Sequence, residues 1–383
     1  MSYKPSVEKC LTEFAAANPI VAQQTLALNG LFRNKQMHEL SNKLIEYVSL
    51  QFFQEGNTLQ KLYDQFISKL ITTIDPLIYA QTMVIIAKSY IKPEDAIIFL
   101  DSIEILSIEA KLYLQVGKGY YYLKQEAKEL LRELVNSCEK SLKANSNIDA
   151  LVHSYLYQLC PLYYAKMKDF DNFYKYGLQY LAYTPEKLMS TEEKVRWSYD
   201  MGIAVLLGPN IYNISELLEK DVFKVLPQTQ HKWLSDLLFT LNGGNITEFN
   251  NVLKVHSEII GKQEQIMANM KGLSLKIRIL QLIELIFLRE KGSRNITFNA
   301  IAQALEIEMK EVEWILMKAM SLKLIKGEID EIEGVARITW VLPRYLDKQR
   351  IAVMQTKFQG WREKTTKVMK DYEQMKANIV VPS

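Results

Sequence analysis

The chain is poor in the residues that build disulfide frameworks and metal sites. Its 383 residues include three cysteines, Cys10, Cys138 and Cys160, which lie far apart. A small, odd number of widely spaced cysteines predicts free thiols and a reducing compartment, which we expect to be the cytoplasm and the nucleus. The four histidines are equally scattered, and none lies at ligand spacing from another histidine or a cysteine. We therefore expect no zinc site of the usual spacings and no other cofactor.

Long apolar runs and strongly charged runs are also missing. No run of about eighteen apolar residues occurs, since even the segment 277–288 contains three polar or charged side chains. Residues 1–11 lack the apolar core and the small-residue cleavage site of a secretory signal. The 47 lysines and arginines nearly balance the 44 aspartates and glutamates. The sequence therefore predicts a soluble protein with no membrane or nucleic-acid partner.

Signatures of catalysis are absent from the sequence. The segment Gly117-Lys118-Gly119 lacks the upstream glycine of a phosphate-binding loop, and three tyrosines follow where a serine or threonine would stand. No Gly-x-Ser-x-Gly nucleophile elbow occurs. We interpret the frequent carboxylate pairs as solvated helix faces. The sequence therefore predicts a protein that is not an enzyme.

Helix signals dominate the first two thirds of the chain. Asp75-Pro76 and Thr184-Pro185 each place an N-cap residue before a first-turn proline. Ser190 and Glu193 have the spacing of a capping box, and the Gly243-Gly244 pair indicates a turn between helices. The helices have short connections, which predicts antiparallel pairs of roughly 35 to 40 residues, the period of tetratricopeptide-like or HEAT-like solenoids. The expected helices are 59–74, 77–90, 93–106, 110–123, 126–141, 150–166, 170–183 and 192–207.

Tyrosine is abundant in the middle of these helices. Such a set could form a stacking platform for single-stranded RNA, or it could fill the space between paired helices. Because arginine and lysine are not interleaved with the tyrosines, the sequence favours tyrosines that fill the space between paired helices. The residues are Tyr120, Tyr121, Tyr122, Tyr155, Tyr157, Tyr163, Tyr164, Tyr174, Tyr176, Tyr180 and Tyr183.

The pattern changes after residue 290. The segment 276–288 is apolar on most faces, which predicts a helix buried between two units, and Gly292 suits its C-terminal cap. A short strand, two helices and a two-stranded ribbon are expected after this helix. That order of elements is typical of a winged helix. The expected elements are 295–298, 299–305, 309–322, 324–329 and 335–341.

The charge of this winged helix argues against DNA binding. The expected recognition helix begins with four glutamates against one lysine, and the wing carries four more acids. These side chains would repel phosphates, which supply most non-specific affinity for DNA. We therefore expect a protein-binding winged helix. Its interface residues would be Ile325, Ile329, Ile338 and Trp340.

Apolar residues recur at spacings of three and four behind Pro343. They form the a/d seam of a coiled-coil or bundle helix over roughly three and a half heptads. A seam that contains Phe358 and Trp361 is costly to leave in water, so we expect it to meet a partner. The alternative is a last helix docked on its own domain. The terminal seam consists of Ile351, Met354, Phe358, Trp361, Thr365, Val368, Tyr372 and Met375.

A helical-repeat region that runs into a winged helix and a terminal bundle helix resembles the PCI family. That family contributes scaffold subunits to the proteasome regulatory lid, the signalosome and translation initiation factor three. Three stretches resemble a proteasome lid subunit in particular, and the third of them is the most specific. They are 62–70 (LYDQFISKL), 231–249 (HKWLSDLLFTLNGGNITEF) and 311–347 (EVEWILMKAMSLKLIKGEIDEIEGVARITWVLPRYLD).

The resemblance implies a mostly α fold with three parts. These are a right-handed helical-repeat superhelix over 1–185, a PCI domain over 186–345, and a C-terminal bundle helix and tail over 346–383. Within the PCI domain, 186–271 would be helical and 272–345 would be the winged helix.

The same resemblance implies a non-catalytic scaffold subunit of the 19S regulatory particle lid that supports ubiquitin-dependent protein degradation. Its partners would be other PCI subunits, the lid deubiquitinase module and the ubiquitin receptor with a von Willebrand A domain. Two alternatives stay open: a scaffold subunit of the signalosome, and an RNA-binding subunit of a translation initiation factor that uses the tyrosine-rich helices.

Overall fold

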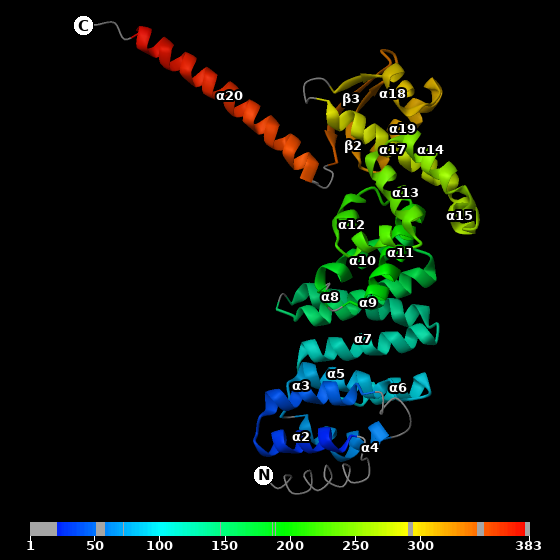
Figure 1. Cartoon of the computed structure of the whole chain (residues 1–383), viewed down its shortest axis with the longest axis vertical. Coiled ribbons are helices and arrows are strands. Elements are labelled where there is room, and N and C mark those ends of the chain that lie inside the picture. The colour runs from blue at the N-terminus through cyan, green and yellow to red at the C-terminus, as the bar shows by residue number, and fades with distance from the viewer. Residues whose placement is uncertain are drawn as a thin grey trace. The chain divides into compact units, whose positions relative to one another are not determined.

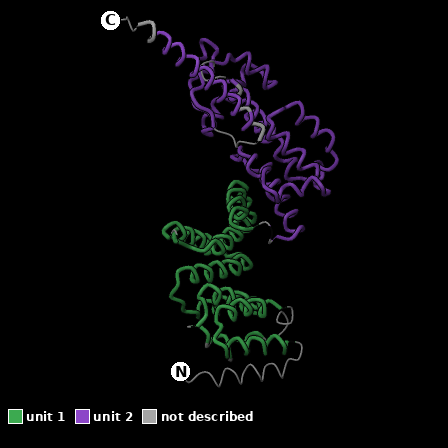
Figure 2. Tube along the Cα trace, turned by 60° about the vertical axis from the view of Figure 1, so that its left-hand side comes forward, with its two compact units in different colours: residues 1–185 green, residues 186–383 purple. Residues whose placement is uncertain are grey.

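The computed structural model describes residues 21–50, 58–71, 73–145, 147–185, 187, 189–289, 294–342 and 348–379. The backbone contacts divide the chain into two compact units, residues 1–185 and residues 186–383, which Figure 2 colours differently. Among the described residues, no helix combines the length and the apolar character that a bilayer crossing requires. The finer domain boundaries drawn from the sequence stay predictions.

Unit 1 is a stack of α-helices joined by short loops (Figure 1). Helix α9 packs along α10, α7 contacts α5, α6, α8 and α9, and α3 contacts α2 and α5. This arrangement confirms the prediction of helical repeats. The helices are α2 (Ala22–Arg33), α3 (Met37–Val48), α4 (Thr58–Gln65), α5 (Pro76–Ala87), α6 (Pro93–Asp101), α7 (Ile108–Lys124), α8 (Lys128–Ala144), α9 (Ala150–Met167) and α10 (Phe170–Tyr183).

Two of the expected helix starts are present as the sequence predicted. The Asp75 carboxylate accepts a hydrogen bond from the Leu77 amide at 2.8 Å, with proline at the first helical position of α5. The Ser190 hydroxyl accepts from the Glu193 amide at 3.2 Å, and the Glu193 carboxylate accepts from the Ser190 amide at 2.9 Å. Both amides of this capping box would otherwise lack a partner in the first turn.

Three details of unit 1 were predicted wrongly. Thr184 is the C-cap of α10, its hydroxyl lies 2.7 Å from the Ser154 hydroxyl, and among the described residues the next α-helix begins only at Thr191. The expected helix 59–74 is divided into α4 and a 3-10 helix, η2 (Ile67–Leu70), because Phe66 leaves helical geometry with φ −123°. The Phe66 ring is buried against Phe32, so tertiary packing overrides the local helix preference. Helix α6 ends at Asp101, five residues earlier than expected.

Several tyrosines of α7, α9 and α10 stack on one another. The Tyr155 ring is stacked between Tyr113 at 4.4 Å and Tyr120 at 5.2 Å, and Tyr164 is stacked on Tyr176 at 5.2 Å. Burial raises the pKa of the Tyr113 hydroxyl to about 12, which keeps this phenol neutral. The Tyr113, Tyr120 and Tyr155 rings face one another rather than solvent, which confirms the packing interpretation for Tyr120 and Tyr155.

The helical part of unit 2 precedes the winged helix. Gly244 has φ +71° and ends α13 in the left-handed conformation, and Asn245 caps the next helix, which confirms the turn predicted at the glycine pair. The elements are α11 (Thr191–Leu207), α12 (Ser215–Glu219), the 3-10 helix η4 (Phe223–Gln228), α13 (Lys232–Gly243), α14 (Ile246–Val255), α15 (Ser257–Gly261), α16 (Glu264–Ala268) and α17 (Met270–Leu288). The C-cap predicted at Gly292 lies outside the described residues.

A three-stranded antiparallel sheet and two helices follow α17, in the order of a winged helix. The strand order is β1-β3-β2, and α17 and α19 pack against the sheet. The register pairs Ile325 with Val341 and Ile296 with Ala336. This order of elements confirms the winged-helix prediction. The elements are β1 (Asn295–Thr297), α18 (Phe298–Leu305), α19 (Met309–Ser321), β2 (Ile325–Asp330) and β3 (Val335–Val341).

Candidate protein-interaction surfaces

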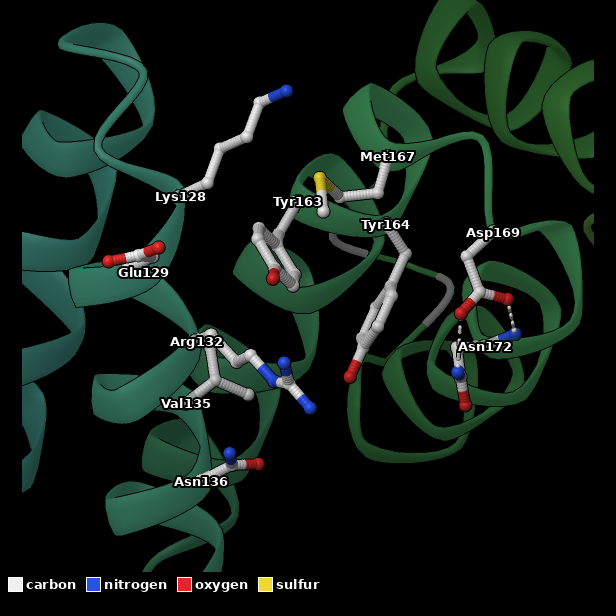
Figure 3. A pocket seen from close by; sticks show the side chains of 10 residues that line it. All are labelled: Lys128, Glu129, Arg132, Val135, Asn136, Tyr163, Tyr164, Met167, Asp169 and Asn172. Atoms are coloured by element: carbon white, nitrogen blue, oxygen red, sulfur yellow. Dashed lines mark hydrogen bonds between the residues drawn. The ribbon is translucent and has the colours of Figure 1, made fainter.

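A hollow of about 550 Å³ lies in unit 1 between α8 and the α9–α10 hairpin (Figure 3). Both cations come from α8, and the aromatic side chains come from α9. No sequence motif indicated this hollow, because its walls come from helices separated by the loop at 145–149. We call it the α8–α9 groove. Its main lining residues are Lys128, Glu129, Arg132, Tyr163, Tyr164 and Met167.

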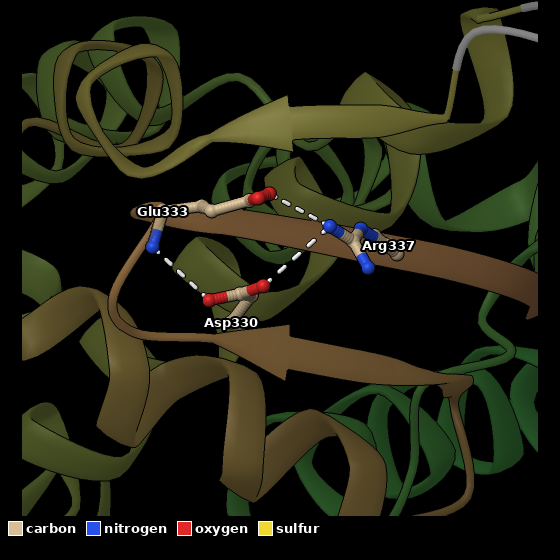
Figure 4. A network of polar contacts seen from close by, with 3 residues as sticks. All are labelled: Asp330, Glu333 and Arg337. Atoms are coloured by element: carbon tan, nitrogen blue, oxygen red, sulfur yellow. Dashed lines mark hydrogen bonds and ion pairs between the residues drawn. The ribbon is translucent and has the colours of Figure 1, made fainter.

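The wing of the winged helix is held by a polar network (Figure 4). Arg337 Nη2 lies 2.7 Å from Glu333 Oε2 and 3.5 Å from Asp330 Oδ2. Asp330 Oδ1 accepts a hydrogen bond from the Glu333 amide at 3.0 Å. Gly334, with φ +62°, completes the turn in a conformation that side chains with a Cβ avoid. Two of the wing acids therefore shape the wing itself, while Ile332 at its tip is fully exposed.

The four predicted interface residues of the ribbon do not lie on one surface. Ile325 is 1% exposed and Ile338 is 5% exposed, so both side chains belong to the core beneath the ribbon. Ile329 and Trp340 are half-buried, and the Lys326 amine lies over the Trp340 ring at 5.2 Å. The alternation of strand side chains places two isoleucines inward, so they can support a partner contact only indirectly. An interface at this ribbon stays a prediction, with Trp340 and Ile329 as its accessible members.

The order of the sheet puts β2 at an edge. Strand β3 pairs with β2 on one side, and among the described residues no strand lies on the other side. An edge strand leaves backbone donors and acceptors available for another chain. The free side of β2 can therefore add a strand from another chain, and β1 is the other edge of this sheet.

Helix α19 exposes an apolar face that the sequence analysis did not single out. Trp314 is 52% exposed and Met317, one turn later, is 49% exposed. The carboxylate of Glu311 lies 3.7 Å from the Arg278 guanidinium of α17. One of the acidic side chains of α19 therefore forms an ion pair within unit 2. The available signal was the spacing of Trp314 and Met317, because residues three apart share a helix face.

The terminal seam lies on helix α20 (Lys348–Ile379), which is 32 residues long. Its large apolar side chains are exposed, from 41% for Met354 to 69% for Trp361. Phe358 is 56% exposed and Trp361 is 69% exposed, and residues 343–347, which join β3 to α20, lie outside the described residues. The alternative of a helix docked on its own domain therefore stays open. Burial of the terminal seam by a partner helix stays a prediction.

The described residues contain no group of three or more histidine, cysteine, aspartate or glutamate side chains placed to hold a metal ion. Cys138 and Cys160 are free and buried. Burial raises the pKa of the Cys138 thiol to about 12, which suppresses the thiolate that a nucleophile or metal ligand requires.

Comparison with known proteins gives matches along both units. Residues 24–238 match the family of PSD13 N-terminal repeats, and residues 253–340 match the PCI domain. The 26S proteasome non-ATPase regulatory subunit 13 homolog A of Arabidopsis thaliana is 31% identical over 355 residues, which cover 91% of this chain and 92% of that protein. The 26S proteasome non-ATPase regulatory subunit 13 of Dictyostelium discoideum is 30% identical over 95% of each chain.

Another relative matches over a shorter part of the chain. The COP9 signalosome complex subunit 2 of Drosophila melanogaster is 31% identical over 105 residues, which cover 27% of this chain and 23% of that protein. The regulatory subunit 13 relatives, in contrast, match through the helical repeats and the winged helix together. The chain therefore belongs to the family of the 26S proteasome non-ATPase regulatory subunit 13.

Proposed function

We propose that the chain is a non-catalytic scaffold subunit of the lid of the 19S regulatory particle, where it supports assembly of the 26S proteasome and ubiquitin-dependent protein degradation. The observation that carries the proposal is the similarity to proteasome regulatory subunits over nine tenths of the chain. This similarity includes the repeats as well as the PCI domain.

The two alternatives have less support. Similarity to a signalosome subunit covers 27% of the chain, so it reflects a shared domain type rather than a shared whole protein. An RNA-binding role in translation initiation would require accessible aromatic faces, whereas Tyr113, Tyr120 and Tyr155 are stacked on one another between helices.

The proposed partners are other PCI subunits of the lid, the lid deubiquitinase module and the ubiquitin receptor with a von Willebrand A domain. Two surfaces support such contacts: the edge of β2 in the winged helix and the terminal seam of α20. The first offers backbone hydrogen bonds and the second offers apolar side chains, which are the two usual sources of affinity in such assemblies. We assign the protein to the cytoplasm and the nucleus.

Purification of the tagged chain from cells in which it is the sole copy tests the proposal. The expected result is recovery of a particle with peptidase activity towards ubiquitinated substrate, while the isolated chain shows no peptidase or deubiquitinase activity. A chain that ends at residue 345 is the control, because it keeps both helical units and lacks α20. Recovery of a deneddylating complex or of small ribosomal subunits instead would contradict the proposal and identify one of the alternatives.

A further inference from the structure

We infer that the α8–α9 groove binds an extended acidic peptide segment of a partner protein. This inference concerns unit 1 and does not depend on the surfaces of the winged helix or of α20.

The groove is elongated. Its main hollow of about 550 Å³ adjoins a second hollow of about 190 Å³, and the two share Lys128, Tyr163 and Met167. The second hollow continues past the α7–α8 turn to Tyr122. A continuous channel that passes two helix hairpins suits a linear segment better than a compact ligand. Binding along such a channel would bury the backbone of the segment against side chains of both hairpins.

The charges in the groove select an acidic ligand. Lys128 and Arg132 lie four residues apart, on one face of α8, and Figure 3 shows Arg132 extending into the hollow towards Tyr164. Among the described residues, no carboxylate lies within ion-pairing distance of either cation. The planar guanidinium of an arginine can bond both oxygens of one carboxylate.

The acids of the groove form no ion pair with these cations. The Asp169 carboxylate is engaged at the start of α10, where it accepts hydrogen bonds from the Asn172 amide at 3.2 Å and from the Asn172 side chain at 2.7 Å. Two further carboxylates line the groove: Glu129 in the main hollow, and Glu126 in the second hollow, where it lies 4.0 Å from the Lys166 amine. These acids would repel the evenly spaced phosphates of a nucleic acid, whereas a peptide can place its acids opposite Lys128 and Arg132 alone.

The opposite wall supplies apolar contact. The Tyr163 and Tyr164 rings and the half-exposed side chain of Met167 come from α9. Tyr164 is held by its stacking on Tyr176, so its ring is a preformed surface for the aliphatic part of a ligand. A segment that alternates acidic and aliphatic residues therefore matches both walls.

Fluorescence anisotropy with the full-length chain and a labelled peptide tests the inference. The probe is fluorescein-Asp-Glu-Leu-Glu-Asp-Leu, and its amide analogue, fluorescein-Asn-Gln-Leu-Gln-Asn-Leu, is the ligand control. We expect saturable binding of the acidic probe and none of the amide analogue. Arg132→Gln should weaken binding about tenfold or more, because charge-assisted hydrogen bonds are the strong ones. Lys140→Gln is the matched control, since it removes the same charge from an exposed position on α8 outside the groove, and it should bind normally.

A charge reversal separates this site from a general attraction between charges. The double variant Lys128→Glu with Arg132→Glu should lose the acidic probe and gain a Lys-Arg-Leu-Arg-Lys-Leu probe, with an unchanged circular dichroism melting curve. No saturable signal up to about 100 µM wild-type protein would overturn the inference. Equal binding by wild type and Arg132→Gln would also overturn it. Tighter, Arg132-dependent binding of a labelled oligouridylate would assign the groove to nucleic acid instead.

Discussion

Lys276 Nζ donates a hydrogen bond to the Gly208 carbonyl oxygen at 2.8 Å, although the lysine is 3% exposed. The same amine donates to the Val205 carbonyl at 2.5 Å. Both carbonyls lie at the C-terminal end of α11, where backbone acceptors lack partners and the helix dipole is negative. One lysine of α17 therefore caps α11 from a distance of 68 residues along the chain.

Replacing this lysine should destabilise unit 2. Lys276→Met keeps much of the aliphatic volume but leaves two buried carbonyls without their donor, and we expect it to lower the free energy of unfolding by about 2 kcal/mol. Urea unfolding followed by circular dichroism measures the change. Lys271→Met, on an exposed position of the same helix, should stay within about 0.5 kcal/mol of wild type. Equal midpoints for the two variants would show that the capping contact adds no stability.

Two glycines of the wing should respond differently to alanine. A Cβ at Gly327 would lie 2.2 Å from the Arg337 carbonyl oxygen and 2.9 Å from Ile338 Cα, so β2 and β3 would have to separate at the bulge. We expect Gly327→Ala to cost about 2 to 3 kcal/mol. Gly334→Ala meets no atom within 4 Å and carries only the penalty of its φ of +62°, about 1 kcal/mol. Thermal unfolding of both variants ranks the two costs, and the reverse ranking would contradict the ribbon geometry.

The two buried cysteines should be inert in the folded protein. Burial raises the pKa of the Cys138 thiol to about 12 and also raises that of Cys160, so neither carries an appreciable thiolate fraction at about pH 8. Iodoacetamide treatment of a Cys10→Ser variant, followed by mass spectrometry, should label neither residue in native buffer and both in urea. Rapid native labelling at Cys138 would contradict its burial.

The same pKa shifts predict how stability depends on pH. A thiol whose pKa rises from 9.0 to about 12 on folding favours the folded state fully below pH 9. Above pH 9 the unfolded chain loses the thiol proton while the folded chain retains it, so the free energy of unfolding should fall as the pH approaches 12. Cys138→Ala should flatten this fall relative to the parent chain, as urea midpoints measured across the alkaline range would show.

The terminal seam should be required for assembly and not for folding. Phe358→Ala with Trp361→Ala should leave the melting temperature of the isolated chain unchanged, because the two side chains are 56% and 69% exposed. Aromatic anchors buried at an interface commonly contribute about 2 kcal/mol or more each, so incorporation into the lid should weaken by on the order of a hundredfold.

Native gels of reconstituted lid measure this incorporation. Met369→Ala is the matched control, since Met369 is 62% exposed on α20 but lies outside the a/d positions. Full incorporation of the double variant would show that the terminal seam does not face a partner. A large fall in the melting temperature of the free chain would show instead that it packs on its own domain.

Local chemistry made much of the fold predictable. Asp75, the Ser190–Glu193 pair and Gly244 each act within a few residues of themselves, so their hydrogen bonds or backbone angles follow from the local sequence. The winged helix was predictable because its strands and helices are short, well separated and differ in hydrophobic period. The a/d spacing of α20 likewise needs no knowledge of its surroundings.

The rest depends on contacts that sequence spacing does not contain. Phe66 leaves α-helical geometry because its ring packs against Phe32 in another helix. In the sequence, Lys276 is a charged residue within an apolar helix. Its burial is explained by the carbonyl oxygens at the end of α11, which accept hydrogen bonds from its amine. The α8–α9 groove is lined by residues from separate helices. Which face of the β2–β3 ribbon is buried depends on the helices that pack against it.

The exposed apolar side chains of α20 have a consequence for the free chain. Any encounter of two free copies along the terminal seam would have a rate that rises with the square of their concentration. The rate of correct assembly rises instead with the product of chain and partner concentrations. If partners cover the terminal seam as predicted, a copy made in excess of them would have self-association as its competing reaction, and balanced synthesis of the subunits would keep that reaction slow.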